Sequence, residues 1–126
     1  MMSNIEVIRE FVQAWSELDA AKLAGYFTQD GCYHNMPTAP VKGRENVEKF
    51  IEKFLANWTQ TQWEILNISA QGDLVYCERI DRTKTTTGDV DLPCFGVFEM
   101  KDGKILEWRD YFDLATYTRA VSGEKR

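Results

Sequence analysis

Two aspartates lie in segments whose alternating residues predict apolar strand faces. In the segment from Ile105 to Tyr117, Asp110 shares one face with apolar residues up to Leu114, because successive strand residues point to opposite sides of a sheet. Those neighbours are Leu106, Trp108, Phe112 and Leu114. Burial disfavours the charged form of a carboxyl group and raises its pKa. A carboxyl group in such surroundings is suited to exchange a proton in a reaction, provided that it has a partner.

A second strand-like segment supplies the expected partner. Arg79 and Asp81 are two residues apart and therefore share a face, which also carries Val75 and Cys77. Because a guanidinium group is planar and donates along two edges, we expect Arg79 to hold Asp81 on one side and Asp110 on the other. An Arg-x-Asp pair is by itself more often a structural or surface ion pair. Together with the apolar face around Asp110, it indicates acid–base catalysis by carboxyl groups.

A third segment carries a phenol and a carboxamide on one face. Tyr33 and Asn35 are also two residues apart, so beside a carboxylate they are placed to hold a water molecule between them. His34, the only histidine, falls on the opposite face by the same alternation. Cys32 and Cys77 are expected to be small apolar packing residues, because no neighbouring base or helix N-terminus would activate their thiols.

The composition indicates one domain over residues 1–126 and argues against two classes of partner. The 126 residues carry a formal net charge of −5 and are 44% hydrophobic, and the pI is about 4.9. An acidic chain without a basic cluster is a poor ligand for nucleic acids and for anionic membrane surfaces. No apolar run approaches the roughly 20 residues of a membrane-spanning helix, and the N-terminal segment lacks the pattern of a signal peptide. We therefore expect a cytoplasmic protein.

Metal and cofactor sites are not expected either. The chain has one histidine and three cysteines, none of them in a C-x-x-C pair, so the ligands of a zinc site are not suitably spaced. Neither of the glycine-rich patterns that bind phosphate occurs. An enzyme with this sequence would use carboxyl, hydroxyl, amide and guanidinium groups, without a metal or other cofactor.

The order of the predicted elements indicates the fold class. Ser3 and Glu6 have the spacing of a capping box, which predicts a first helix from Ser3 onward. Further helices are predicted over residues 22–26 and 44–58, a loop over 37–43, and strands over 32–36, 63–69, 74–83, 91–100 and 105–117. Helices followed by an antiparallel meander indicate an α+β domain.

Three motifs follow one another along the chain: Tyr33-His34-Asn35-Met36-Pro37, Glu78-Arg79-Ile80-Asp81 and Trp108-Arg109-Asp110-Tyr111-Phe112-Asp113. This ordered set resembles the limonene-1,2-epoxide hydrolase family, and the resemblance covers nearly the whole chain. It implies a nuclear-transport-factor-2-like α+β cone, in which N-terminal helices pack on a curved mixed, mainly antiparallel sheet around an internal pocket. It also implies a homodimer and a cofactor-independent hydrolase that adds water to a small apolar epoxide in one step, giving a vicinal diol.

The resemblance further implies a role for each candidate residue. Asp81 matches the base that deprotonates a water molecule, and Asp110 matches the acid that protonates the epoxide oxygen. Tyr33 and Asn35 match the residues that position the water, and Arg79 matches the bridge between the aspartates. The residues themselves favour the same division, because Asp81 beside Arg79 is expected to be charged and Asp110 on its apolar face to be neutral.

The sequence also predicts residues of the pocket wall and is compatible with two alternative functions. Trp108, Phe112 and Leu114 are expected to bind the substrate, and the other three tryptophans are expected in the core: Trp15, Trp58 and Trp63. Two other functions fit the same residues. One is a ketosteroid-isomerase-like or polyketide-cyclase-like acid–base enzyme, and the other is a non-catalytic protein that binds an apolar ligand.

Overall fold

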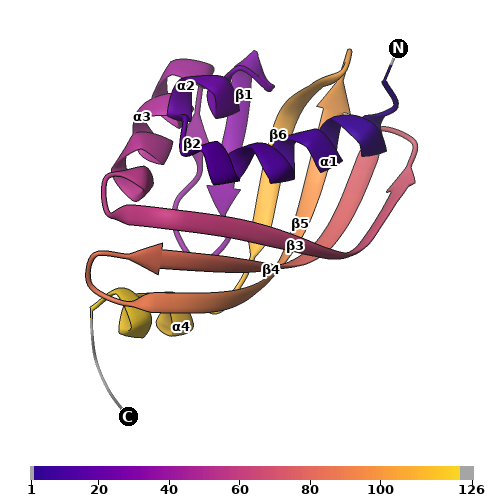
Figure 1. The fold of residues 1–126 in the computed structure, drawn as a ribbon. Coiled ribbons are helices and arrows are strands. Elements are labelled where there is room, and N and C mark those ends of the chain that lie inside the picture. Colours follow the sequence, from indigo (N-terminus) through magenta and orange to yellow (C-terminus); the bar gives the residue numbers. More distant parts are fainter. Residues whose placement is uncertain (1, 123–126) are drawn as a thin grey trace.

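A computed structural model describes residues 2–122 as a six-stranded sheet with helices against it (Figure 1). The elements in chain order are α1 (Asn4–Ala14), the 3-10 helix η1 (Trp15–Glu17), α2 (Ala20–Ala24), β1 (Phe27–Asn35), β2 (Val41–Lys42), α3 (Arg44–Leu55), β3 (Trp58–Gln71), β4 (Leu74–Thr85), β5 (Asp89–Lys101), β6 (Lys104–Tyr111) and α4 (Leu114–Val121). Within these residues no helix is long and apolar enough to span a membrane.

The sheet is mixed and mainly antiparallel. Its strand order is β2-β1-β6-β5-β4-β3, with β3 to β6 paired antiparallel and β1 parallel to β6. The long strands bend strongly, so that the sheet curves around α1, while α4 lies at the other end of the molecule against β5 (Figure 1). Because β2 and β3 are edge strands that each pair on one side only, the sheet does not close into a barrel. The predicted α+β class with a curved mixed sheet is confirmed.

The core lies between α1 and the inner face of the sheet. The capping box of α1 is present: Ser3 N donates to Glu6 Oε1 at 2.9 Å, and Glu6 N donates to Ser3 Oγ at 3.2 Å. Phe11 on the inner face of this helix is fully buried and meets Trp108 edge to face, with ring centroids 5.2 Å apart. Trp15 at its end stacks on Trp63 at 4.3 Å, so aromatic packing fixes the helix across the sheet.

The ends of the chain's last strand differ from the prediction. The strand ends at Tyr111 rather than at residue 117, and a helix follows over Leu114–Val121. The reason is a cap, since the Asp113 side chain accepts from Thr116 N at 3.2 Å and so starts α4. The other strands are longer than expected, and residues 28–31, which lie outside the predicted strands, belong to β1 at an irregularity in its pairing with β6.

A β-bulge also changes one strand face. The pairing of β5 with β6 shifts between Glu99 and Met100, where Leu106 has no partner. Ile105 is therefore fully buried and Leu106 is only half-buried. The prediction that Leu106 shares a face with Trp108 and Asp110 is wrong for this reason.

Candidate active site

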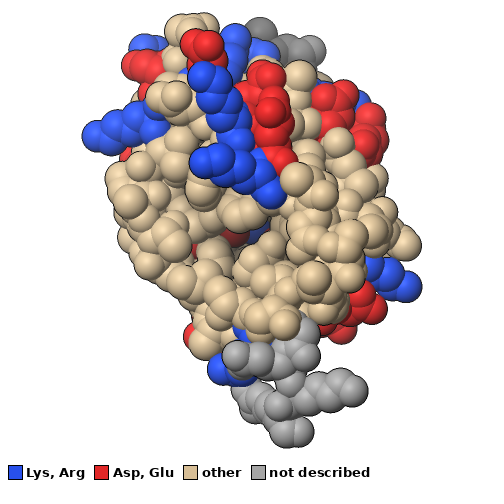
Figure 2. Space-filling model, turned by 90° about the vertical axis from the view of Figure 1, so that its left-hand side faces the viewer, with Lys and Arg blue, Asp and Glu red and all other residues tan. Residues whose placement is uncertain are grey.

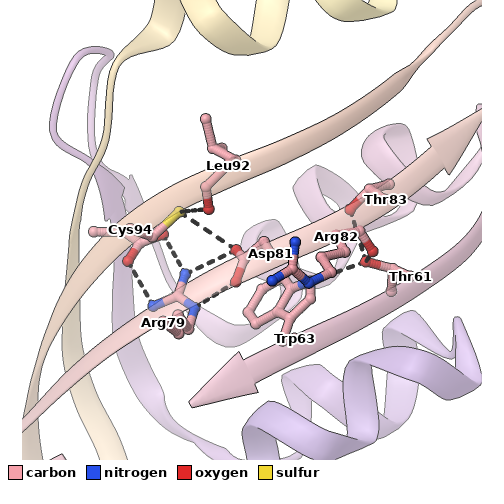
Figure 3. Close-up of polar contacts among 9 residues, drawn as sticks. Thr61, Trp63, Arg79, Asp81, Arg82, Thr83, Leu92 and Cys94 are labelled. Carbon is pink, nitrogen blue, oxygen red and sulfur yellow. Dashed lines mark hydrogen bonds and ion pairs between the residues drawn. The ribbon is translucent and has the colours of Figure 1, made fainter. Parts of the chain in front are cut away.

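The Arg79 guanidinium lies between two carboxyl groups, as strand alternation predicted. Arg79 Nε donates to Asp81 Oδ1 at 2.8 Å and Nη2 donates to Asp81 Oδ2 at 3.1 Å, as Figure 3 shows. On its other side, Nη1 donates to Asp110 Oδ1 at 2.9 Å and Nη2 donates to Asp110 Oδ2 at 2.6 Å. The exposed fractions of Arg79, Asp81 and Asp110 are 0%, 6% and 4%. One buried cation therefore serves two buried acids through bidentate contacts.

The sheet register brings these three residues together. Asp81 lies opposite Leu92 on β5, Arg79 opposite Cys94, and Gly96 of β5 opposite Asp110 of β6. A side chain at Gly96 would leave no room for the guanidinium, because a Cβ there would stand 3.0 Å from Arg79 Nη1. Gly96 was not among the predicted site residues, although a glycine inside a strand is a known sign of close approach by another group.

Two indole rings flank the guanidinium. The Arg79 Cζ atom lies 4.6 Å from the Trp63 ring centroid and 5.4 Å from that of Trp108. Such contacts stabilise a cation that burial has stripped of water. Trp108 is fully buried and is not among the residues that line the cavity, which corrects its expected place in the pocket wall. Its ring instead stacks on Tyr33, with centroids 4.2 Å apart and planes 3° from parallel, and so positions the phenol.

Asp81 lies in dry surroundings. Burial raises the pKa of Asp81 from 3.8 to about 6, against the opposing effect of Arg79, and the nearby Asp110 raises it further. Cys94 Sγ lies 3.5 Å from Asp81 Oδ2 and is the weak donor on that oxygen (Figure 3). From the sequence, Arg79 was expected to keep Asp81 charged. Burial acts against this expectation, because Arg79 is shared with Asp110 and does not offset the loss of water around Asp81, although a group with a pKa of about 6 is still mostly ionised at pH 7.

Asp110 has polar neighbours from the adjacent strand. β1 runs parallel to β6 with Asn35 opposite Asp110 and Tyr33 opposite Trp108. Asn35 is 5% exposed, and its Oδ1 atom is buried without a hydrogen-bond partner among the described residues. Burial and the charge of Asp110 raise the pKa of Tyr33 well above its usual range, so the phenol keeps its proton. An unpartnered acceptor and a phenol beside a carboxylate form a site for a water molecule.

A cavity of about 230 Å³ opens onto both carboxyl groups. In Figure 2 the surface is hollowed at this side, the rim is formed by uncharged residues, and acidic and basic atoms are visible at the bottom. The lining residues are Tyr33, Asn35, Thr38, Phe50, Phe54, Trp58, Trp63, Asp81, Leu92, Asp110, Phe112, Leu114 and Tyr117.

The lining agrees with the sequence analysis for some residues and departs from it for others. Phe112 and Leu114 face the cavity, although both lie beyond the end of β6. Trp58 and Trp63, expected in the core, also line it. Tyr117 was missed, because the last segment was predicted as strand rather than helix. An aromatic residue three positions after Leu114 would have marked the same helix face.

The arrangement of donors favours proton transfer over metal binding. Asp81, Cys94 and Asp110 each have a ligand atom within 4.8 Å of the others. However, the guanidinium of Arg79 already holds the oxygens of both carboxyl groups and places a positive charge among them. Burial and the Asp81 carboxylate raise the pKa of the Cys94 thiol, which therefore is not the thiolate that a metal ion requires.

His34 stands apart from this cluster. It is half-buried and is not among the residues that line the cavity. Its Nε2 atom lies 2.9 Å from the carbonyl oxygen of Thr38, a contact that ties the end of β1 to the following turn. This position agrees with the predicted orientation away from Tyr33 and Asn35, so the site contains no imidazole group.

The fold and this cluster together define a carboxyl-based site in an α+β cone. The family model of the limonene-1,2-epoxide hydrolase catalytic domain matches residues 2–122, and the chain belongs to that family. The epoxide hydrolase EphG of Mycobacterium tuberculosis is 27% identical to it over 107 residues, which make up 85% of this chain and 71% of that protein.

Solved structures agree with this assignment. The structure of an epoxide hydrolase of the limonene-1,2-epoxide hydrolase type from M. tuberculosis is 26% identical, with a TM-score of 0.81 over 95% of this chain and 90% of that one. A protein with a ketosteroid-isomerase-like fold from Catenulispora acidiphila reaches a TM-score of 0.85 at 20% identity, covering 95% of this chain and 94% of that one. The second likeness shows that the fold is shared.

Proposed function

We propose that this protein hydrolyses small apolar epoxides to vicinal diols in one step and without a bound cofactor. The observation that carries the proposal is the Arg79 guanidinium, which holds Asp81 and Asp110 together at the bottom of an apolar cavity. Opening an epoxide with water requires one proton to leave the water and another to reach the ring oxygen. Two carboxyl groups in different protonation states supply both transfers. Membership of the epoxide hydrolase family supports the same reaction.

In the proposed reaction Asp110 is the base. Tyr33 and Asn35 hold the water molecule beside it, with the free Asn35 Oδ1 atom accepting one of the water hydrogens. As Asp110 takes the other hydrogen, the water oxygen forms a bond to an epoxide carbon and the bond from that carbon to the ring oxygen breaks. The electron pair of the broken bond stays on the ring oxygen.

Asp81 is the acid that completes the step. Its proton passes to the ring oxygen as the electron pair arrives there, and the diol forms. Because its pKa is raised to about 6, a useful fraction of Asp81 carries this proton near neutral pH. After the reaction Asp110 holds the proton that Asp81 has lost, and Arg79, which contacts both groups, stabilises either arrangement of charge. A proton exchanged with solvent restores the starting state.

These roles reverse the division expected from the sequence. The water-positioning residues lie next to Asp110, since β1 pairs with β6 and not with β4. The neighbours of Asp81 are instead Leu92 and Cys94, which place no acceptor for a water hydrogen beside it. Asp81 is therefore the better acid and Asp110 the better base.

The size and lining of the cavity support a small substrate. Its volume of about 230 Å³ is below the range of roughly 300–1,000 Å³ found for pockets that hold drug-sized ligands. Most of the wall is aromatic or aliphatic, from residues such as Phe50, Phe54 and Phe112. A compact cyclic hydrocarbon epoxide, of which limonene-1,2-epoxide is an example, is the proposed substrate type.

A panel of small epoxides in ¹⁸O-labelled water tests this function. We expect diols that carry one ¹⁸O atom, formed by the wild-type protein and lost in Asp110→Asn and Asp81→Asn variants that remain folded by circular dichroism. Near-normal diol formation by Asp81→Asn would reject the mechanism. Proton exchange next to a ketone without epoxide turnover would favour an isomerase-like enzyme, and tight binding without conversion would favour a binding protein.

We also propose that two copies of the chain associate, as the family resemblance implies. Large apolar side chains are exposed on the strands: Leu66 at 45%, Phe95 at 42% and Tyr111 at 44%. Phe95 and Tyr111 are cross-strand neighbours, so they form a continuous exposed pair. Light scattering after gel filtration should give about twice the chain mass of 14.6 kDa, whereas the mass of a single chain would reject the dimer.

A further inference from the structure

A polar pair stands in the otherwise apolar part of the cavity wall. Trp58, the first residue of β3, donates from its indole Nε1 to the hydroxyl oxygen of Tyr117 in α4 at 3.0 Å. Both side chains line the cavity. The pair is not used by the proposed reaction, since neither residue belongs to the carboxyl cluster around Arg79.

The direction of this hydrogen bond leaves one hydrogen available. An indole N–H can only donate, so the Tyr117 oxygen must be the acceptor. The Tyr117 hydroxyl hydrogen has no acceptor among the residues of the described range 2–122, and it belongs to a side chain on the cavity wall. Burial raises the pKa of Tyr117, and the phenol therefore stays neutral and able to donate. The cavity thus contains a hydrogen-bond donor that is oriented by Trp58.

The strand register places this donor away from the reacting groups. Trp63 lies opposite Asp81, whereas Trp58 lies opposite Thr85, four positions farther along β4. Four strand residues span about 13 Å. The wall between the two ends is formed by apolar side chains, including those of Phe54, Leu92 and Leu114. A ligand that reaches both ends would meet the carboxyl groups at one end and the Tyr117 hydroxyl at the other.

We propose that Tyr117 is a specificity-determining residue that donates a hydrogen bond to an oxygen acceptor on the substrate, remote from the epoxide ring. This inference rests on the proposed function and narrows its substrate class to small, mainly apolar epoxides that carry a carbonyl or ether oxygen at the far end. A donor that is already oriented and partly shielded from water favours a ligand with an acceptor over a hydrocarbon of the same shape, because the hydrocarbon leaves the donor unpaired.

Two isosteric substrates test the inference. In 4-acetylcyclohexene oxide a carbonyl oxygen replaces the terminal CH₂ group of 4-isopropenylcyclohexene oxide. We expect the wild-type protein to favour the acetyl compound in kcat/KM by about threefold to tenfold, chiefly through KM, as one net hydrogen bond predicts. Tyr117→Phe should bring this ratio to about one, chiefly because KM for the acetyl compound rises. An equal preference in the wild type and in Tyr117→Phe would overturn the inference.

Two further variants separate specificity from folding. Tyr76→Phe removes a hydroxyl whose contact is with Gln71 and which is not on the cavity wall, so it should keep the preference. Trp58→Phe keeps the Tyr117 hydroxyl but removes the group that orients it, and it should weaken the preference without abolishing it. If Tyr117→Phe does not fold, a weakened preference in Trp58→Phe supports the inference and an unchanged preference overturns it.

Binding of unreactive analogues distinguishes this inference from the proposed function. Dissociation constants for cyclohexyl methyl ketone and isopropenylcyclohexane can be measured by tryptophan fluorescence, since Trp58 and Trp63 line the cavity. Tighter binding of the ketone that is lost in Tyr117→Phe supports the role of Tyr117 even if no epoxide is hydrolysed. If both epoxides are hydrolysed but neither the acetyl epoxide nor the ketone is preferred over its isopropenyl counterpart, the proposed function is supported and the role of Tyr117 is overturned.

Discussion

Arg79 and Arg82 lie three residues apart on one strand, and each contacts two carboxylates. Arg79 is fully buried between Asp81 and Asp110. Arg82 points to the opposite side of the sheet, where its Nη2 atom lies 2.8 Å from Glu64 and its Nη1 atom 3.2 Å from Asp91, with 46% of its side chain exposed. The types of group and the distances are nearly the same in the two clusters. What differs is the amount of water around them.

Water decides what each cluster can do. Around Arg82, solvent screens the charges and each acid keeps its own hydration, so the contacts contribute little to stability and do no chemistry. Around Arg79, two carboxyl groups and one guanidinium group share a buried space with little access to solvent. Such a cluster is stabilised by taking up a proton, which is why burial raises the pKa of Asp81 to about 6. The same residue types thus form a surface ion pair on one face and a proton-transfer site on the other.

Replacing each arginine in turn is the strongest way to break this comparison. Arg79→Met leaves two buried acids without their cation and should destabilise the fold by about 3–5 kcal/mol at pH 7. Arg82→Met, the matched change on the exposed side, should cost no more than about 1 kcal/mol. Urea unfolding followed by tryptophan fluorescence measures both. Similar losses for the two variants would show that burial does not distinguish the clusters.

Replacing one acid in each cluster separates catalysis from charge. Asp110→Asn keeps the shape of the side chain but removes the base, and the rate of diol formation should fall by about 10²–10⁴-fold. Asp91→Asn removes a partner of Arg82 and should leave the rate unchanged. The two variants are compared by measuring kcat for the same epoxide under steady-state conditions. A loss of less than tenfold in Asp110→Asn would contradict its role as the base.

The stability of the buried cluster should depend on pH in a defined direction. Because the pKa of Asp81 rises from 3.8 to about 6 on folding, this group favours the folded state below pH 3.8, and that contribution disappears as the pH rises through 6. The rise in the pKa of Asp81 from 3.8 to about 6 corresponds to a change of about 3 kcal/mol in the free energy of unfolding. Asp81→Asn should therefore be inactive and yet at least as stable as the wild type at pH 7. Denaturant unfolding between pH 4 and pH 8 tests this, and a clear destabilisation of the variant at pH 7 would count against it.

The smallest expected effect concerns Cys94. Its thiol donates weakly to Asp81 and lowers the pKa of that group, so Cys94→Val should raise it. In the wild type, kcat/KM should fall as the pH rises above about 6, because the acid loses its proton. In Cys94→Val this fall should move upward by about half a pH unit. Cys32→Val, at a half-buried thiol outside the cavity lining, is the control and should leave the profile in place.

Strand alternation made the main residues of the site predictable. Whether Arg79 and Asp81 face the core depends only on their spacing within one unbroken strand, and β4 alternates between buried and exposed positions along its length. The capping box at Ser3 and Glu6 was predictable for a similar reason, since its two hydrogen bonds join residues three apart. Local periodicity was therefore sufficient for the class of fold and for the inward direction of these side chains.

Features that depend on contacts between distant segments were not predictable. The pKa of Asp81 depends on Leu92 and Cys94 of the neighbouring strand, and no spacing in the sequence gives that register. Trp108 lies behind Tyr33 rather than in the pocket because β1 adds in parallel beside β6. Tyr117 was missed because the Asp113 cap ends the extended segment, so the alternation was followed too far.

The assignment of acid and base can be tested by infrared difference spectroscopy of the free protein between pH 4 and pH 8. We expect the carbonyl band of a protonated carboxyl group to titrate near pH 6 in the wild type, where the pKa of Asp81 lies. This band should be absent from Asp81→Asn. In Asp110→Asn it should persist and titrate at a lower pH, because the repulsion by the second carboxylate is gone. A band that persists in Asp81→Asn and disappears in Asp110→Asn would contradict the account and restore Asp110 as the acid.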